Sequence, residues 1–288
     1  MFEGVYTALV TPFTRDDAVD YEALGRLIDR QLSEGVDGFV PVGTTGESPT
    51  LGVEEHQRVI EFTVERTAGR AKVIAGTGAN ATSEALSLTR HAQQAGADGC
   101  LQVAPYYNKP NQMGLIRHFS AVADLGLPVV LYNIPGRTGI DIEPATVAEL
   151  ARHPSIVAIK EATGSVDRVS RYLDSCDIEV LSGDDPLTLP MMVVGGVGVI
   201  SVAANVVPGL VSEMVHAALD GRWAEARTLH ARLYPLFKDL FIDTNPIPVK
   251  AALAMMGQIE ELYRLPLCAM TDERKAQLRR TLEATGLL

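Results

Sequence analysis

One repeating unit decides the fold of this chain, and from Val129 to Lys160 it reads VVLYNIPGRTGIDIEPATVAELARHPSIVAIK. It begins with an apolar run of strand-forming residues, continues into a stretch with helical periodicity, and ends in a second apolar run. Both runs are continuously apolar rather than alternating, which is typical of parallel strands that are covered on both faces. The unit therefore predicts a strand, a helix and a second, parallel strand.

The same succession recurs along most of the 288 residues. Eight strands are predicted, at Val5–Phe13, Gly38–Val42, Lys72–Gly76, Gly99–Pro105, Val129–Ile134, Ile156–Lys160, Ile178–Leu181 and Gly198–Ala203. The helices expected after them are Tyr21–Glu34, Val53–Thr67, Ser83–Ala95, Gln112–Ala123, Pro144–Ala151, Ser165–Asp174, Pro186–Val194 and Val207–Leu219. Eight such units predict a closed (β/α)8 barrel. An open doubly wound sheet uses the same units, but no unit carries a convincing dinucleotide-binding fingerprint.

The strand signals stop after Gly221. Helical patterns follow at Trp223–Asp239, Pro248–Met256 and Thr271–Thr285. We therefore expect a barrel catalytic domain over residues 1–221 and a C-terminal helical domain over residues 222–288.

Composition and charge narrow the class of protein. The net charge is -11 and the basic residues form no cluster, which argues against nucleic-acid binding. No stretch is long and apolar enough to span a bilayer, and the N-terminus lacks the pattern of a secretion signal. The cysteines are three in number and far apart in the sequence, as expected of reduced residues in a cytoplasmic protein.

Polar side chains follow the ends of several predicted strands, where barrel enzymes carry their active sites. Lys160 closes a strand that should be buried on both faces, and desolvation would lower its pKa and leave an amine able to attack a carbonyl. The alternatives are a lysine that extends into solvent or one that pairs with Glu161. The six histidines form no ligand pair, so we expect neither a metal nor a cofactor.

Other residues at these strand ends suit a small keto acid. Thr44 and Thr45 lie in a glycine-flanked turn that exposes backbone N–H groups to a carboxylate, although a simple tight turn would look the same. Tyr132 is either core material or a proton carrier beside the lysine. Arg137, in a Pro-Gly-Arg-Thr-Gly loop, is either a carboxylate-binding fork or a solvated arginine. The glycines from Gly195 to Gly198 cradle a phosphate, permit close packing or leave room for substrate near Ile200.

Taken together, these segments resemble the dihydrodipicolinate synthase family, a branch of the pyruvate-dependent class I aldolases, over essentially the whole chain. The resemblance rests on Gly43-Thr44-Thr45-Gly46-Glu47, Pro105-Tyr106-Tyr107-Asn108, Tyr132–Gly139, Ile159–Thr163, Leu181–Asp185 and Asn245-Pro246-Ile247-Pro248-Val249-Lys250. Arg137 and the Asn245–Lys250 segment favour the synthase branch over the lyases of neuraminate and keto-deoxy sugar acids.

The resemblance implies a mechanism. Pyruvate would form an imine with Lys160, its carboxylate resting on the turn of Thr44 and Thr45, and the enamine would attack L-aspartate 4-semialdehyde to give 4-hydroxy-tetrahydrodipicolinate for lysine and diaminopimelate biosynthesis. Tyr132, Thr44 and Tyr107 would relay protons. Arg137 would hold the second substrate's carboxylate, with Gly183 and Ile200 lining the pocket.

The resemblance also implies an assembly and a regulator. Tyr107 would reach a neighbouring subunit, so a homotetramer built from tight dimers is expected. Lysine would inhibit at a site formed by Ser48, His56, Asn80, Glu84 and Tyr106. Two departures from the sensitive pattern, Pro49 and Val53, leave interface packing as the alternative role. A pyruvate-dependent sugar-acid lyase and a non-catalytic barrel that binds ligands remain the rival functions.

Overall fold

Eight parallel strands form a closed barrel in the computed structural model, which describes residues 1–288. The strands are β1 (Gly4–Ala8), β2 (Gly38–Val40), β3 (Lys72–Gly76), β4 (Gly99–Val103), β5 (Val129–Asn133), β6 (Ile156–Glu161), β7 (Glu179–Ser182) and β8 (Gly198–Ser201). They pair in sequence order, and β8 closes the barrel against β1. The predicted (β/α)8 barrel is therefore confirmed.

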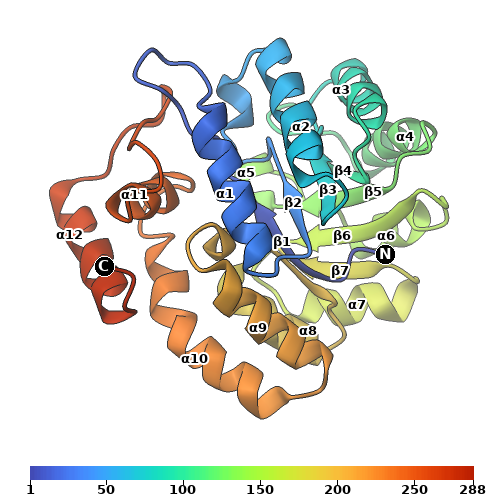
Figure 1. Ribbon diagram of the computed structural model, residues 1–288. Coiled ribbons are helices and arrows are strands. Elements are labelled where there is room, and N and C mark those ends of the chain that lie inside the picture. Colours follow the sequence, from blue (N-terminus) through green and yellow to red (C-terminus); the bar gives the residue numbers. More distant parts are fainter.

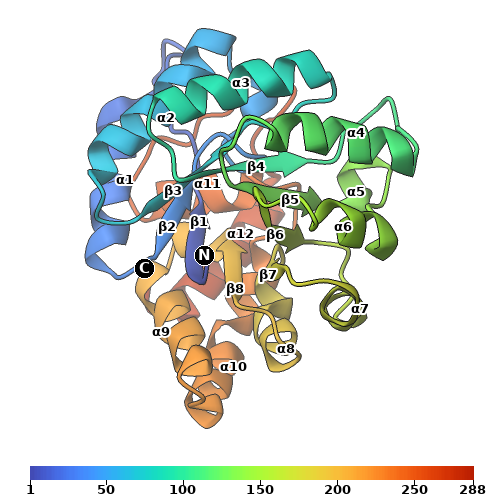
Figure 2. The ribbon, with the colours of Figure 1, turned by 90° about the vertical axis from the view of Figure 1, so that its right-hand side faces the viewer.

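Helices surround the strands (Figures 1 and 2). They are α1 (Tyr21–Ser33), α2 (Val53–Thr67), α3 (Thr82–Gln94), α4 (Gln112–Ala123), α5 (Pro135–Thr138), α6 (Pro144–Leu150), α7 (Asp167–Ser175), α8 (Thr188–Val193) and α9 (Pro208–Leu219), with single 3-10 turns at Ser48–Thr50 (η1), Asp185–Leu187 (η2) and Ala203–Asn205 (η3). Helix α1 illustrates why they form: its apolar side chains are buried, and the Asp20 side chain caps its first turn by accepting from Ala23 N.

The first two strands end earlier than predicted. Strand β1 stops at Ala8, and Phe13 instead forms an isolated antiparallel bridge with Val19 outside the barrel. Strand β2 stops at Val40, because Pro41 has no N–H to donate and Val42 adopts a left-handed backbone with a φ of 49°. Such a φ is strained for a β-branched residue. The strain occurs where the chain turns into the Gly43–Glu47 loop.

The segment around Arg137 was expected to be a loop, and that expectation is wrong. Residues Pro135–Thr138 form the short helix α5. Pro135 supplies a suitable φ at the first helical position, and Gly139 ends the helix in the left-handed conformation while its N–H donates to Pro135 O at 2.9 Å. Arg137 therefore has a backbone fixed by helix α5.

Three further helices follow the barrel, α10 (Trp223–Asp239), α11 (Ile247–Met255) and α12 (Asp272–Ala284). Figure 1 shows them in orange and red along one side of the molecule. Helix α10 packs against α9, α12 packs against α10 and α11, and α11 reaches the barrel at η3. The domain boundary at residue 221 stays a prediction. None of the helices has both the length and the apolar character needed to cross a membrane.

The alternation of side chains along β5 and β6 positions the site. Tyr132 is in register with Lys160, and Asn133 is in register with Glu161. Because successive side chains of a strand point to opposite faces, the first pair and the second pair lie on opposite sides of the barrel wall. Asn133 and Glu161 contact Tyr172 of the outer helix α7, so Tyr132 and Lys160 point into the barrel.

Candidate active site

Lys160 is buried near the end of β6, with 6% of its surface exposed. Its Nζ lies 4.3 Å from the centre of the Tyr132 ring, and it forms no hydrogen bond or ion pair within the chain. The pKa of Lys160 is lowered to about 7, chiefly by burial; the Asp185 carboxylate opposes this shift and the positive charge of Arg137 adds to it. A large fraction of this amine is uncharged at neutral pH.

Neither structural alternative for Lys160 holds. The residue does not extend into solvent, because its side chain is enclosed by the barrel. Nor does it pair with Glu161, whose carboxylate accepts from the Tyr172 hydroxyl at 2.6 Å and from Thr163 N at 2.6 Å on the outer side of the strand. The two adjacent side chains therefore occupy different environments.

Tyr132 lies beside Lys160 and lines a cavity of about 200 Å³. The cavity opens between the carboxyl ends of several strands and is also lined by Thr44, Tyr106 and Arg137. Burial raises the pKa of Tyr132 to about 12, against the opposing effects of Arg137 and of a hydrogen bond with the Thr44 side chain. The phenol is therefore neutral near pH 7 and holds a proton that it can give to a bound substrate.

The turn after β2 presents unused backbone donors. The N–H groups of Gly46 and Ser48 donate to Gly43 O, whereas those of Thr44 and Thr45 donate no hydrogen bond within the chain. Successive free N–H groups form a concave site for an anion. Gly46 permits this tight turn, because a Cβ there would lie 2.9 Å from the backbone N of Val42. The turn thus leaves two N–H groups without a partner in the chain, and their role as a carboxylate site stays a prediction.

Arg137 and Thr45 share a partner that the sequence interpretation did not assign. The guanidinium Nη2 of Arg137 donates to the carbonyl O of Asn245 at 2.9 Å, and the side-chain Nδ2 of Asn245 donates to Thr45 Oγ1 at 2.9 Å. Asn245 lies in the connection from α10 to α11, far from both residues in sequence. In the sequence, Asn245 stood out only as part of the Asn245–Lys250 segment that resembles the family, and that resemblance did not predict a contact with Thr45 or Arg137.

Gly183 and Ile200 lie near Lys160 but offer it different surroundings. A Cβ at Gly183 would lie 3.0 Å from Lys160 Cε, so glycine leaves room for the lysine side chain. The N–H of Gly183 is already engaged by Glu161 O at 2.8 Å, which leaves its carbonyl for a ligand. Ile200 is buried in β8. Nearby Asp185 accepts hydrogen bonds from Ser201 Oγ and from the N–H groups of Val202 and Ala203.

Tyr107 lies outside the cavity. Its side chain is 91% exposed, and its backbone has a φ of 72°, which is unusual for a tyrosine. The adjacent Tyr106 does line the cavity. The predicted proton relay from Tyr132 through Thr44 to Tyr107 is therefore not assembled within a single chain.

Four of the five residues expected to bind lysine border a second cavity of about 190 Å³, which shares lining residues with the first. Ser48, His56, Glu84 and Tyr106 line it, and the Asn80 side chain donates to Tyr106 O at 3.3 Å. Burial lowers the pKa of His56 to about 4, so this imidazole is neutral. Ser48 and Tyr106 also line the first cavity. The structure thus brings the five predicted residues together, and two of them border both cavities.

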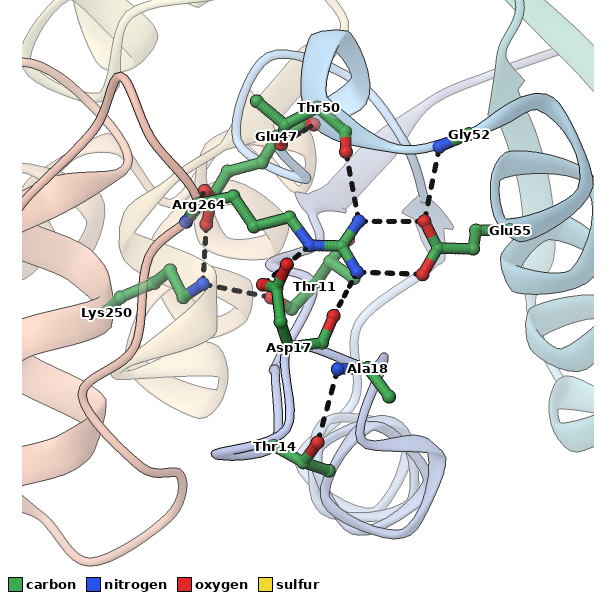
Figure 3. A network of polar contacts seen from close by, with 10 residues as sticks. All are labelled: Thr11, Thr14, Asp17, Ala18, Glu47, Thr50, Gly52, Glu55, Lys250 and Arg264. Atoms are coloured by element: carbon green, nitrogen blue, oxygen red, sulfur yellow. Dashed lines mark hydrogen bonds and ion pairs between the residues drawn. The ribbon is translucent and has the colours of Figure 1, made fainter.

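A buried ion pair connects Glu47, at the end of the Gly43–Glu47 loop, to Lys250, as Figure 3 shows. Lys250 of α11 donates to Glu47 and to Thr11 O, the latter at 3.0 Å. Arg264 forms a two-pronged ion pair with Glu55 and donates to Thr50 O at 2.9 Å. Sequence patterns gave no role to Arg264 or to the Glu47–Lys250 pair. Elsewhere, no three His, Cys, Asp or Glu side chains are grouped so as to hold a metal ion.

Comparison with known proteins identifies this arrangement. The model of the "Dihydrodipicolinate synthetase family" matches residues 1–285. The chain belongs to this family. A relative from Pelobacter propionicus named 4-hydroxy-tetrahydrodipicolinate synthase is 53% identical over 100% of both chains. The crystal structure of dihydrodipicolinate synthase from Aquifex aeolicus is 53% identical, with a TM-score of 0.98 over 99% of each chain.

A third family member bears on regulation. The structure described as DHDPS from Cyanidioschyzon merolae with lysine bound is 43% identical, with a TM-score of 0.96 over 100% of this chain and 99% of that one. The full-length matches confirm the predicted family and enzyme class, a lyase of the 4-hydroxy-tetrahydrodipicolinate synthase type in lysine biosynthesis.

Proposed function

We propose that Lys160 is the nucleophile that joins pyruvate to L-aspartate 4-semialdehyde. Its neutral amine attacks the keto carbon, water leaves, and an imine forms. Loss of a proton from the methyl carbon gives an enamine, which forms a carbon–carbon bond to the aldehyde carbon, whose oxygen becomes a hydroxyl by taking up a proton. The amino group of the second substrate then attacks the imine carbon, expels Lys160 and closes the ring of 4-hydroxy-tetrahydrodipicolinate.

The observation that carries this assignment is a lysine buried without a counter-charge in contact. Burial lowers its pKa to about 7, which supplies the reactive amine without further activation. Tyr132, whose ring packs on that amine, is the proton donor and acceptor for these steps. Thr44 connects the phenol to the next group of the relay.

Two groups account for the carboxylates of the substrates. The free N–H groups of Thr44 and Thr45, with the Thr45 hydroxyl, receive the carboxylate of pyruvate. Arg137, on the rim of the same cavity, receives the carboxylate of aspartate semialdehyde through its planar guanidinium. Gly183 and Ile200 complete the wall around the imine.

A homotetramer of tight dimers completes the site. Tyr107 is exposed in one chain, so a second chain that covers it would bring each phenol to the relay of its neighbour. On another part of the surface, exposed Val193 and Trp223 border an apolar hollow, as expected for a second interface. We place the enzyme in the cytoplasm, where the three unpaired cysteines would stay reduced.

Lysine is the proposed regulator, and it acts from the second cavity. Glu84 would pair with the ammonium group of the inhibitor and Asn80 would bind its carboxylate, beside Ser48, His56 and Tyr106. Because Ser48 and Tyr106 also border the first cavity, a ligand that moves them changes the wall of the active site. Pro49 and Val53 line the second cavity, where lysine would bind, so they set the strength of inhibition.

A coupled assay with pyruvate and aspartate semialdehyde, with and without lysine, tests the function. Borohydride reduction in the presence of pyruvate should leave an adduct on Lys160. Arg137→Ala should raise the KM for aspartate semialdehyde roughly tenfold or more while the adduct still forms. Turnover of a keto-deoxy sugar acid without turnover of aspartate semialdehyde would refute the assignment. A protein that shows neither an adduct nor turnover would instead be a non-catalytic barrel that binds ligands.

A further inference from the structure

Asn245 connects the two proposed carboxylate sites. Its side chain donates to Thr45 Oγ1 at 2.9 Å, and its backbone carbonyl accepts from Arg137 Nη2 at 2.9 Å. The residue is 7% exposed, so these hydrogen bonds are shielded from water. One residue of the C-terminal segment therefore contacts a group on each side of the reacting centre, at two different atoms.

The direction of the hydrogen bond to Thr45 has a chemical consequence. A threonine hydroxyl has one proton to donate and lone pairs with which to accept. Because Asn245 Nδ2 is the donor, the Thr45 oxygen accepts, and the hydroxyl proton stays free for another partner. An anionic carboxylate needs such a donor. An acceptor at position 245 would take the proton instead and turn the hydroxyl away from the substrate.

We propose that Asn245 is a positioning residue that directs the Thr45 hydroxyl proton toward the carboxylate of pyruvate. Through its backbone carbonyl, the same residue fixes where the Arg137 guanidinium stands. The inference rests on the proposed roles of Thr45 and Arg137. The effects on Thr45 and on Arg137 can be separated, because a substitution of the Asn245 side chain removes the hydrogen bond to Thr45 and leaves the backbone carbonyl that holds Arg137.

The surroundings of Asn245 hold it in place for this role. Ile247 N donates to Thr244 O at 2.8 Å and Lys250 N donates to Pro246 O at 3.1 Å, and α11 begins at Ile247, two residues after Asn245. The Tyr263 hydroxyl donates to Ile247 O at 3.0 Å. Lys250 ties the same helix to Glu47, two residues beyond Thr45 in the loop. The side-chain Oδ1 of Asn245 is buried without a partner in the chain, so the amide is held through its donor alone.

The test compares Asn245→Ala with Asn245→Asp, which has nearly the same shape but presents an acceptor. We expect Asn245→Ala to raise the KM for pyruvate about threefold to tenfold, and Asn245→Asp to raise it more, by roughly tenfold or above. The KM for aspartate semialdehyde should change by less than about twofold in Asn245→Ala. Borohydride trapping at a series of pyruvate concentrations should show the same shift.

Two further variants decide whether the effect passes through Thr45. With Thr45→Val as background, Asn245→Ala should add little, because the hydroxyl that it orients is gone. Gln277→Ala is the matched control, since it removes a side-chain amide that donates to Asp239 within the same C-terminal helices and touches no active-site residue. It should leave both KM values unchanged.

The outcomes are distinct from those that test the proposed function. An unmodified Lys160 in the wild type would refute the function itself. An active wild type together with an Asn245→Asp variant of unchanged KM for pyruvate would overturn the role of Asn245. Additive effects in the double variant, or equal increases in both KM values, would also overturn it. If Asn245→Ala does not fold, Asn245→Asp decides alone.

Discussion

Two buried lysines of this chain differ in one respect, which is whether a carboxylate contacts the amine. Lys160 is 6% exposed and Lys250 is 0% exposed. Each packs on an aromatic ring, with Nζ 4.3 Å from the centre of Tyr132 in one case and 4.2 Å from that of Phe13 in the other. Burial lowers the pKa of both.

The partner is what differs. Lys250 donates to the Glu47 carboxylate and to a backbone carbonyl, both of which favour its charged form. Lys160 has no such contact, and its acid neighbour in the sequence, Glu161, faces the outer side of the barrel wall. Burial thus favours the neutral form of a lysine, and a carboxylate in contact with the amine restores the charged form.

The largest expected effect comes from removing the unpaired lysine. Lys160→Ala should lower kcat by roughly 10⁴-fold or more, because the group proposed to form the covalent intermediate is lost. It should also abolish the borohydride adduct. Thermal unfolding should show that the variant is at least as stable as the wild type, since a buried amine without a partner is removed. Unchanged turnover in Lys160→Ala would contradict the proposed role of Lys160 as the nucleophile.

The paired lysine should respond in the opposite way. Lys250→Met leaves Glu47 buried without its cation and should cost about 3–5 kcal/mol of unfolding free energy, or roughly 10 °C in Tm. The adduct at Lys160 should still form in the folded fraction. The double variant Glu47→Gln/Lys250→Met should recover part of the stability, because no buried charge remains unpaired. A stable single variant would show that the pair is not required.

The smallest effect concerns pH. The pKa of Lys160 is lowered to about 7, so imine formation should fall about tenfold for each pH unit well below 7 and level off above it. The Asp185 carboxylate raises this pKa, so Asp185→Asn should shift the midpoint to lower pH by a fraction of a unit. Rates of borohydride trapping between pH 5 and about 9 would measure both effects.

The lowered pKa of Lys160 also predicts how the free energy of unfolding depends on pH. Below about pH 7 Lys160 is protonated in both the folded and the unfolded chain, so the burial of its charge lowers the free energy of unfolding by its full amount. Above that pH the folded chain releases the proton first. That cost shrinks as the pH rises from about 7 toward the ordinary lysine value. In Lys160→Ala this rise should be absent from the pH profile of unfolding free energy. A midpoint of trapping near the ordinary lysine pKa would contradict the enclosed environment described above.

The sequence by itself determined the barrel. Eight continuous apolar runs separated by amphipathic stretches predict parallel strands with covering helices, and the count of eight without a dinucleotide-binding fingerprint favours a closed barrel over an open sheet. The polar residues that follow those runs gather at one rim because parallel strands end together. Lys160, Tyr132 and Thr44 were predicted on that basis, with the family resemblance supplying their roles. Local pattern is enough for such conclusions because it is set by periodicity and by the direction of the strands.

Only the tertiary structure decided the environment of each lysine. In the sequence Lys160 ends an apolar run and Lys250 lies within one, and Lys160 has a glutamate beside it whereas Lys250 has none. In space the relation is reversed, because strand alternation turns Glu161 away and a contact across 203 residues brings Glu47 to Lys250. Asn245 reaches Thr45 across 200 residues. A pKa depends on distances between charges and on exclusion of water, and neither is a property of the sequence alone.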